Sequence, residues 1–245
     1  MKNLALTLLL LISVVFAICG AAPSQDEPGQ KHYFFVLLMR PSNPPQLNKE
    51  AGEKLQEEHM NNIRKLASER KLLVAGPFMD DTSLRGIFVL QAASADEAQE
   101  WSNGDPAVHA GRLAAEVHGP WLLPDGALHE VPADTKGMEQ YTLVLMKRGD
   151  KWDPRASSVS EILEQHYAFL NKMTSEENVA VAGPFPVNAH TDLNGVAIFR
   201  VGVDKTNQLL QDDPAIKAGV LVPEAHPWIT GKGVLAPGQP FEMKE

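Results

Sequence analysis

Apolar residues in the first half of the chain fall into short runs separated by one long segment of helical spacing. Residues 33–39 form a short run rich in aromatic and aliphatic side chains, which indicates a strand. Residues 50–69 have the spacing of an amphipathic helix. One stripe of that helix is made of Leu55, His59, Ile63 and Leu66.

Three further strands, at 72–75, 86–91 and 116–121, are predicted after this helix. Between the last two, Ser94 as N-cap and Glu97 at the third helical position predict a capping box and a helix that runs to about residue 101. Gly76 and Pro77 predict a turn at the end of the second strand. The element order is βαββαβ, which is the ferredoxin-like arrangement.

The second half of the chain repeats the first. The segment AGPF that starts at Ala75 recurs at Ala182, an offset of 107 (182 − 75). The segment DPAVHAG that starts at Asp105 recurs as DPAIKAG at Asp213, an offset of 108 (213 − 105). Offsets that hold within a residue or two along a whole module indicate a tandem duplication.

Other pairs follow the same spacing. Leu38-Met39 matches Leu145-Met146 at an offset of 107 (145 − 38), and Pro120-Trp121 matches Pro227-Trp228 at 107 (227 − 120). The second copy is expected to contain the same elements, at 141–147, 157–174, 179–182, 195–201, 204–211 and 222–228.

A ferredoxin-like module carries both helices on one face of its sheet, so the other face has to be covered. Two modules in one chain can cover each other, and we expect an α+β pseudo-dimer that pairs sheet to sheet. The expected boundaries are 32–122 for the first module, 123–138 for a linker, 139–229 for the second module and 230–245 for a tail.

The first 22 residues have the pattern of a secretory signal peptide. Lys2 provides a positive charge, residues 4–18 form an apolar run too short to span a bilayer comfortably, and small residues follow. We expect cleavage, a flexible leader at 23–31 and a periplasmic or secreted protein. Cys19 is the only cysteine and offers lipid anchoring as the alternative, although Ile18 stands where such signals prefer a small residue.

The net charge of the chain limits which classes of partner it can bind. The formal net charge is −9 and no long run of Lys or Arg occurs, which disfavours nucleic acid because its phosphates would be repelled. Beyond the signal, no segment is apolar enough for a membrane span. The expected partner is a small-molecule ligand or substrate, and a further homo-oligomer is left open. Without a thiol beyond residue 19, disulfides and a cysteine nucleophile are not expected.

Taken in order, these motifs resemble the YCII-related domain. A helix with a His precedes an Ala-Gly-Pro segment, a Ser-x-x-Glu-Ala helix start and an Asp-Pro-x-x-x-x-Gly segment. The resemblance covers about 31–121 and 139–228. It implies ferredoxin-like modules that pair as a dimeric α/β barrel. A few relatives act on small aromatic or quinone-like compounds, whereas export and tandem fusion depart from most relatives.

The resemblance also implies an active site made of the helix His and the Asp of Asp-Pro. These residues are His59 with Asp105, and His166 with Asp213. A carboxylate that fixes the tautomer of an imidazole makes it a general base. The alternative is structural: each His lies on an apolar stripe and would be a core residue, and Asp before Pro is a good helix N-cap for local reasons.

Two other strand ends combine a carboxylate with an imidazole, in Glu116-Val117-His118 and Glu224-Ala225-His226. They suggest a metal site with His59 and Asp105, against the alternative of alternating polar residues at a strand end. We expect no bound metal, because these residues do not form a convincing ligand set. We expect no cofactor, because the sequence has no cofactor-binding motif such as a phosphate-binding glycine loop. Haem chemistry, which occurs on paired ferredoxin-like barrels, is a further alternative that depends on fold alone.

The expected function is therefore that of an exported small-molecule enzyme with a His–Asp general base, of isomerase, lyase or hydrolase type. A non-catalytic module that binds or senses a small ligand in the cell envelope is the alternative. A purely structural role for the fold is the third hypothesis.

Overall fold

The computed structural model describes residues 32–124, 126–128, 137–187 and 191–235, which lie in one compact unit that begins at Lys31. The expected signal peptide, the leader and Cys19 lie outside these residues, as do part of the expected linker and the last ten residues of the tail. None of the helices in the described ranges has both the length and the apolar character needed to cross a membrane.

The first half of this unit is a ferredoxin-like module, as predicted. Its sheet has the strand order β2-β3-β1-β4, with every neighbouring pair antiparallel. Its elements are β1 (His32–Met39), α1 (Lys49–Ser68), β2 (Leu72–Pro77), β3 (Leu84–Ala92), α2 (Ala95–Asn103), the short α3 (Pro106–His109) and β4 (Ala114–His118).

The second half has the same topology, with the strand order β6-β7-β5-β8. Its elements are β5 (Met138–Arg148), α4 (Ser157–Ser175), β6 (Val179–Pro184), β7 (Leu193–Phe199), α5 (Val203–Leu210), the short α6 (Pro214–Lys217) and β8 (Leu221–Gly231). The predicted α+β fold of two βαββαβ modules is confirmed.

Local capping fixes where the helices begin. The side chain of Asn48 accepts a hydrogen bond from the amide of Ala51 at the start of α1. At the start of α2, Ser94 accepts from the amide of Glu97, and the Glu97 carboxylate accepts from the amide of Ala93. The capping box predicted for α2 is thus present in a modified form. The Glu97 carboxylate accepts from the amide of the residue before the N-cap instead of the amide of the N-cap itself.

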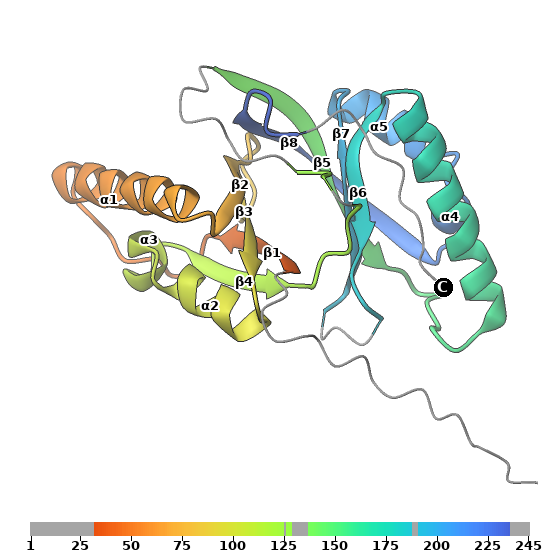
Figure 1. Ribbon diagram of the computed structural model, residues 1–245, viewed down its shortest axis with the longest axis horizontal. Coiled ribbons are helices and arrows are strands. Elements are labelled where there is room, and N and C mark those ends of the chain that lie inside the picture. The colour runs from red at the N-terminus through yellow and green to blue at the C-terminus, as the bar shows by residue number, and fades with distance from the viewer. Residues whose placement is uncertain (1–31, 125, 129–136, 188–190, 236–245) are drawn as a thin grey trace, which may run out of the picture. The chain divides into compact units, whose positions relative to one another are not determined.

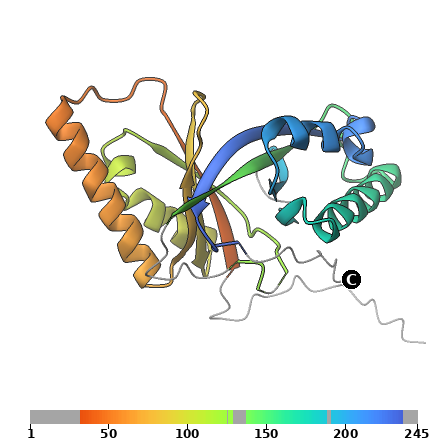
Figure 2. The ribbon, with the colours of Figure 1, turned by 90° about the horizontal axis from the view of Figure 1, so that it is seen from above.

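The two sheets pack face to face, with the helices on the outer faces (Figures 1 and 2). Alternate residues of each strand point into a shared central core, and the residues between them point toward the helices. The largest side chains of this core come from both modules and include Phe35, Phe78, Trp121, Phe185 and Trp228. The expected sheet-to-sheet pairing is therefore the actual arrangement.

Main-chain contacts join each sheet edge to the other module. The Met79 amide donates to the Pro227 carbonyl at 2.8 Å, and the Leu122 amide donates to the Pro184 carbonyl at 3.0 Å. Trp121 is fully buried, and its indole Nε1 donates to the Gly183 carbonyl at 2.9 Å. These contacts join the edge strands β2 and β6 to the other module, and the buried Trp121 and Trp228 are packing residues of the shared core.

The prediction of a turn at Gly76-Pro77 is wrong, and so is the equivalent one at Gly183-Pro184. Both dipeptides continue a strand, β2 and β6 respectively. The glycines are needed because the main chain of the other module passes very close, as strand β8 at Gly76 and as the segment after β4 at Gly183. A Cβ at Gly76 would collide with the carbonyl oxygen of Ile229, and one at Gly183 would collide with that of Leu122.

The strand register also corrects one pair of the repeat. Leu38 pairs with Gly86 in the first sheet, and Met146 pairs with Gly195 in the second. Met146, rather than Leu145, is therefore the counterpart of Leu38, and the offset in this strand is 108 (146 − 38). The difference matters because a shift of one residue moves a side chain to the opposite face of a sheet.

The close approach at Gly76 gives a first prediction. Gly76→Ala should destabilise the fold by about 1–3 kcal/mol, because the added methyl group overpacks a rigid main-chain contact between modules. Gly52→Ala is the matched control, since nothing lies within 4 Å of a Cβ there and alanine favours helix. Thermal denaturation measures both. Equal melting temperatures for wild type and Gly76→Ala would contradict the proposed close packing.

Candidate functional site

His59 and Asp105 meet in the first module, although they are far apart in sequence. The Nδ1–H of His59 donates to both carboxylate oxygens of Asp105, at 2.8 Å to Oδ1 and 2.9 Å to Oδ2. The Asp105 side chain is fully buried. The predicted pair therefore exists as a contact, and its geometry is that of an imidazole whose tautomer is set by a carboxylate.

Asp105 has two roles at once. It is the N-cap of α3, where Oδ1 accepts from the Ala107 amide at 2.9 Å and Pro106 occupies the first helical turn. Its Oδ2 also accepts from Asn62 Nδ2 at 2.9 Å. The helix cap fixes the carboxylate, and the carboxylate then fixes the imidazole. The local and the functional interpretations of this residue are compatible.

The sequence did not indicate Asn62 as a site residue. It lies three residues after His59 on α1, so both side chains emerge from the same face of the helix. That spacing was the available signal. Phe88 of β3 is a second residue that the sequence does not indicate. Its ring stacks with His59 at a centroid distance of 6.0 Å and an interplanar angle of 21°.

His59 lies on the wall of a cavity of about 920 Å³ that is lined mainly by α1 and the first sheet, with Met138 of β5 and Thr230 and Gly231 of β8 also on its wall. Because Nδ1 is bound to Asp105, Nε2 is the ring nitrogen left to meet a ligand. Only Leu66 of α1 is buried, in keeping with a cavity beneath this helix. Much of the wall is apolar and includes Leu38, Leu55, Ile63, Leu72, Phe88 and Leu113.

The second module holds an equivalent pair in a different setting. His166 Nδ1 lies 2.6 Å from Asp213 Oδ2, and Asp213 caps α6 as Asp105 caps α3. The exposed fraction of the His166 side chain is 2%, however, against 12% for His59. Helix α4 lies tightly on its sheet and buries five residues: Val159, His166, Leu170, Met173 and Thr174.

The side chains around this second pair also differ. Phe169 stands where the first module has Asn62, an offset of 107 (169 − 62). Tyr167 packs against His166, with ring centroids 5.3 Å apart. Burial raises the pKa of Tyr167, and a hydrogen bond with Asn194 opposes that rise. Two aromatic side chains, Tyr167 and Phe169, thus stand near His166 where the first module has Met60 and Asn62.

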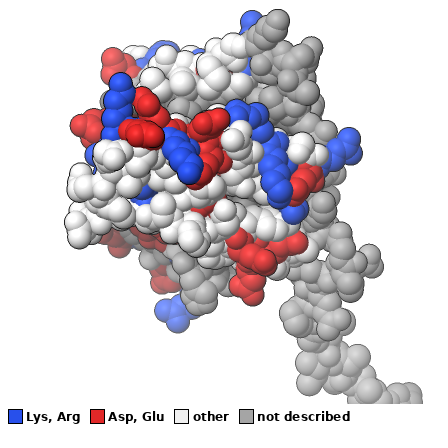
Figure 3. Space-filling view, turned by 90° about the vertical axis from the view of Figure 1, so that its left-hand side faces the viewer, with Lys and Arg blue, Asp and Glu red and all other residues white. Residues whose placement is uncertain are grey.

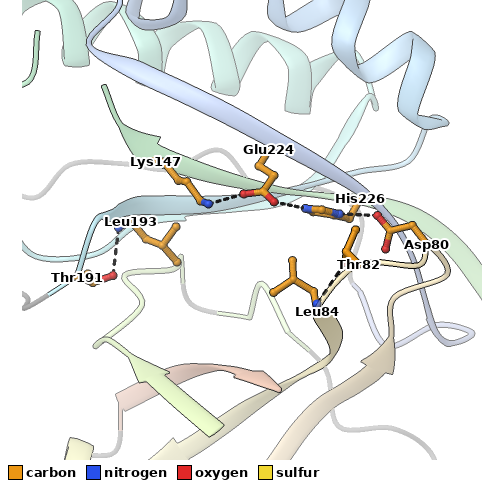
Figure 4. Close-up of polar contacts among 8 residues, drawn as sticks. All are labelled: Asp80, Thr82, Leu84, Lys147, Thr191, Leu193, Glu224 and His226. Carbon is orange, nitrogen blue, oxygen red and sulfur yellow. Dashed lines mark hydrogen bonds and ion pairs between the residues drawn. The ribbon is translucent and has the colours of Figure 1, made fainter. Parts of the chain in front are cut away.

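The strand-end residues considered for a metal lie elsewhere. His226 Nδ1 bonds to Asp80 Oδ2 of the other module at 2.6 Å, and its Nε2 lies 3.1 Å from Glu224 Oε1 (Figure 4). Glu224 also forms an ion pair with Lys147 at 2.5 Å. These groups join the two modules and do not contact His59. Within the described ranges, no three His, Cys, Asp or Glu residues are grouped to hold a metal ion.

His118, the counterpart of His226, is buried without such a partner. Its Nε2 lies 3.3 Å from Glu116 Oε1, but neither ring nitrogen has a hydrogen bond of good geometry within the described ranges. Burial lowers the pKa of His118 below its ordinary value, and the carboxylates of Glu116 and Asp192 oppose the shift only in part. The folded state therefore favours the neutral imidazole.

This shift predicts a loss of stability in acid. The unfolded state binds a proton near the ordinary pKa of 6.5, whereas the folded state resists protonation until a lower pH. The stabilisation is thus complete above pH 6.5 and is lost as the pH falls through the lowered pKa. His118→Gln should lose less stability than wild type between about pH 7.5 and pH 5, as measured by urea denaturation. Parallel pH profiles for the two proteins would refute the assignment.

Comparison with known proteins adds a family and a fold. Residues 34–118 match the YCII-related domain. No curated protein matches the chain. The structure is similar to a variant of chlorite dismutase from Candidatus Nitrospira defluvii, with a TM-score of 0.53 and 10% identity over 82% of this chain and 91% of that one.

Two further solved structures are similar. A candidate chlorite dismutase, TA0507, has a TM-score of 0.52 and 12% identity over 82% of this chain and 94% of that one. A candidate monooxygenase from Fusobacterium nucleatum subsp. nucleatum has a TM-score of 0.51 and 9% identity over 88% and 100%. Such identities show the fold alone. Residues 34–118 are a YCII-related domain, in a chain whose two modules share the dimeric α/β barrel fold of the chlorite dismutases.

Proposed function

We propose that the protein is an enzyme that moves a proton on a small molecule bound in the cavity of the first module. His59 is the general base and Asp105 orients it. One observation carries the proposal: the Nδ1 of His59 is fixed by a buried carboxylate, while the ring forms part of a large cavity wall. A base must lie within reach of its proton in a defined tautomer, and this pair meets both conditions.

The steps follow from the contacts. Nε2 takes a proton from the substrate, and the ring then carries a positive charge beside the Asp105 carboxylate, which stabilises it. Asn62 and the Ala107 amide hold that carboxylate in place. Phe88 restrains the plane of the ring. The imidazolium can then return the proton to another atom of the substrate in isomerisation, or to the leaving group in elimination. In hydrolysis Nε2 takes the proton from a water molecule that attacks the substrate, and the imidazolium gives that proton to the leaving group as its bond breaks.

We further propose that only the first His–Asp pair is catalytic, and that the pair of His166 and Asp213 is structural. The near-complete burial of His166 supports this division. The shared topology and the offsets support a tandem duplication in which the second module is a divergent YCII-like copy. The signal-like first 22 residues support export to the periplasm or the medium.

The proposal is tested by proton NMR in D₂O with a panel of phenols, quinones, lactones and 2-oxo acids. This measurement detects hydrolysis, elimination, isomerisation and proton exchange together. His59→Gln should lower turnover by about 10²–10⁴-fold, because that is the usual contribution of a general base. Asp105→Asn should also lower it, since the amide can donate to Nδ1 and so favours the wrong tautomer.

His166→Gln is the matched control, because it removes the imidazole of the equivalent pair. It should lower the melting temperature and leave turnover unchanged. If it abolishes turnover as fully as His59→Gln does, the choice of site is wrong. A further outcome is that compounds raise the melting temperature of the wild type but not of His59→Gln, with none of them turned over. In that case the protein is a binding or sensing module of the kind considered above.

Haem-dependent redox chemistry is a second candidate, favoured by the likeness in fold to chlorite dismutases. The site fits such a group in two respects. His59 would hold the iron through Nε2, and the arginine side chains on the cavity wall would suit the propionate carboxylates. Bound haem would supply electron transfer that the side chains of this chain cannot. A visible absorption spectrum of the purified protein separates this candidate from proton transfer.

A further inference from the structure

The charge on the cavity wall is one-sided. Four arginines line it, and its lining residues include no Asp or Glu, although the whole chain has a formal net charge of −9. The four are Arg40, Arg64, Arg85 and Arg112. They come from the loop after β1, from α1, from β3 and from the segment between α3 and β4. A cleft lined by one sign of charge concentrates ligands of the opposite sign.

Most of the hydrogen-bonding capacity of these arginines is unused. Arg112 donates to the Pro45 carbonyl at 2.7 Å, and Arg64 donates to Asn61 Oδ1 at 2.5 Å. A guanidinium has five N–H donors, so one such bond leaves most of them available. Neither arginine, nor Arg85, forms an ion pair with any residue that the structure describes.

The fourth arginine is only loosely neutralised. Arg40 lies 4.0 Å from the Asp81 carboxylate, and the side chain of Asp81 is 94% exposed. Exposed ion pairs at this distance contribute little and exchange readily with other anions. On the face of the molecule shown in Figure 3, charged side chains of both signs run in a band between uncharged areas. The single sign of charge is thus a property of the cavity wall and not of this face of the molecule.

The second module provides an internal comparison. By strand register and repeat offset, Asn171, Asn194 and Val220 stand where the first module has Arg64, Arg85 and Arg112. The offsets are 107 (171 − 64), 109 (194 − 85) and 108 (220 − 112). Only Arg40 has a charged counterpart, Arg148, whose guanidinium stacks on Trp152 at 5.0 Å. The second module, in which the histidine is buried, thus has no charge at three of these four positions.

We infer that the cavity of the first module binds a small amphipathic organic anion, with a carboxylate or phenolate near the arginines and an apolar body against the leucine-rich wall. Guanidinium groups bind carboxylates with planar, often paired, hydrogen bonds. Binding stands on the cavity alone. The catalytic meaning rests on the proposed function: a proton removed next to a carboxylate or carbonyl leaves a negative charge that nearby arginines stabilise.

The test uses benzoate and its neutral isostere benzamide as probes, with calorimetric titration of the full-length purified protein at low ionic strength. Benzoate should bind more tightly than benzamide, and added salt should weaken only benzoate. Arg85→Gln and Arg112→Gln should each weaken benzoate by about tenfold, because each removes hydrogen bonds to a charged group. Benzamide binding should be unchanged in both variants.

Arg148→Gln is the matched control, since it removes an arginine from the equivalent strand end of the other module, and benzoate binding should be unaffected. Circular dichroism checks that each variant is folded. The inference is overturned if benzoate does not bind, if benzamide binds equally well, or if Arg148→Gln has the same effect as Arg85→Gln.

His59→Gln separates this inference from the proposed function. If the variant binds benzoate and keeps full turnover of a panel compound, the general-base proposal fails and the anion site stands. If it loses turnover while benzoate and benzamide bind alike, the base stands and the anion site fails.

Discussion

Each ferredoxin-like sheet has a face that its own helices cannot cover, and the packing of these two faces against each other is the constraint on which the rest of the structure depends. Burial of Phe35, Trp121, Phe185 and Trp228 in one shared core removes apolar surface of both sheets from water. The glycines of β2 and β6 let the main chain of the other module approach closely enough to close the barrel. Neither sheet could remain exposed on this face in water.

Because the central core holds the two sheets together, the outer layers can differ. Helix α4 lies tightly on its sheet, with five buried residues, whereas α1 buries one and leaves a cavity. An underpacked helix is tolerable when most of the stability comes from another interface. The open site of the first module and the closed site of the second are thus two outcomes of one scaffold. Stability and ligand access are assigned to different surfaces.

Much of this could be predicted from the sequence, and the reasons are specific. Strand and helix periodicity depend on which face is buried, and the pairing of modules follows from a sheet with one bare face. The contact between His59 and Asp105 followed from a resemblance, since a separation of 46 residues carries no geometric information by itself. Asn62 could have been found from helical spacing, because it follows His59 by three residues.

Other features depend on distances that no local pattern encodes. Gly76 is required because β8 of the other module passes too close for a side chain there. The dipeptide Gly-Pro does not encode that distance, and taken alone it favours a turn. The Leu-Met dipeptide occurs in both β1 and β5, one residue apart in the repeat. Sequence matching therefore aligns β5 with β1 one residue away from the alignment that the strand register gives. The cavity and its arginines depend on the height of α1 above its sheet, which one or two side chains can change.

The presence of both modules in one chain has an evolutionary consequence. In a symmetric dimer of identical subunits, every substitution occurs at two places at once, so a bulky side chain that closes one pocket closes both. A single polypeptide is free of that rule. Tyr167 could therefore occlude one half while the equivalent position in the other half, Met60, stayed compatible with an open cavity. One half could specialise as support while the other kept an open cavity.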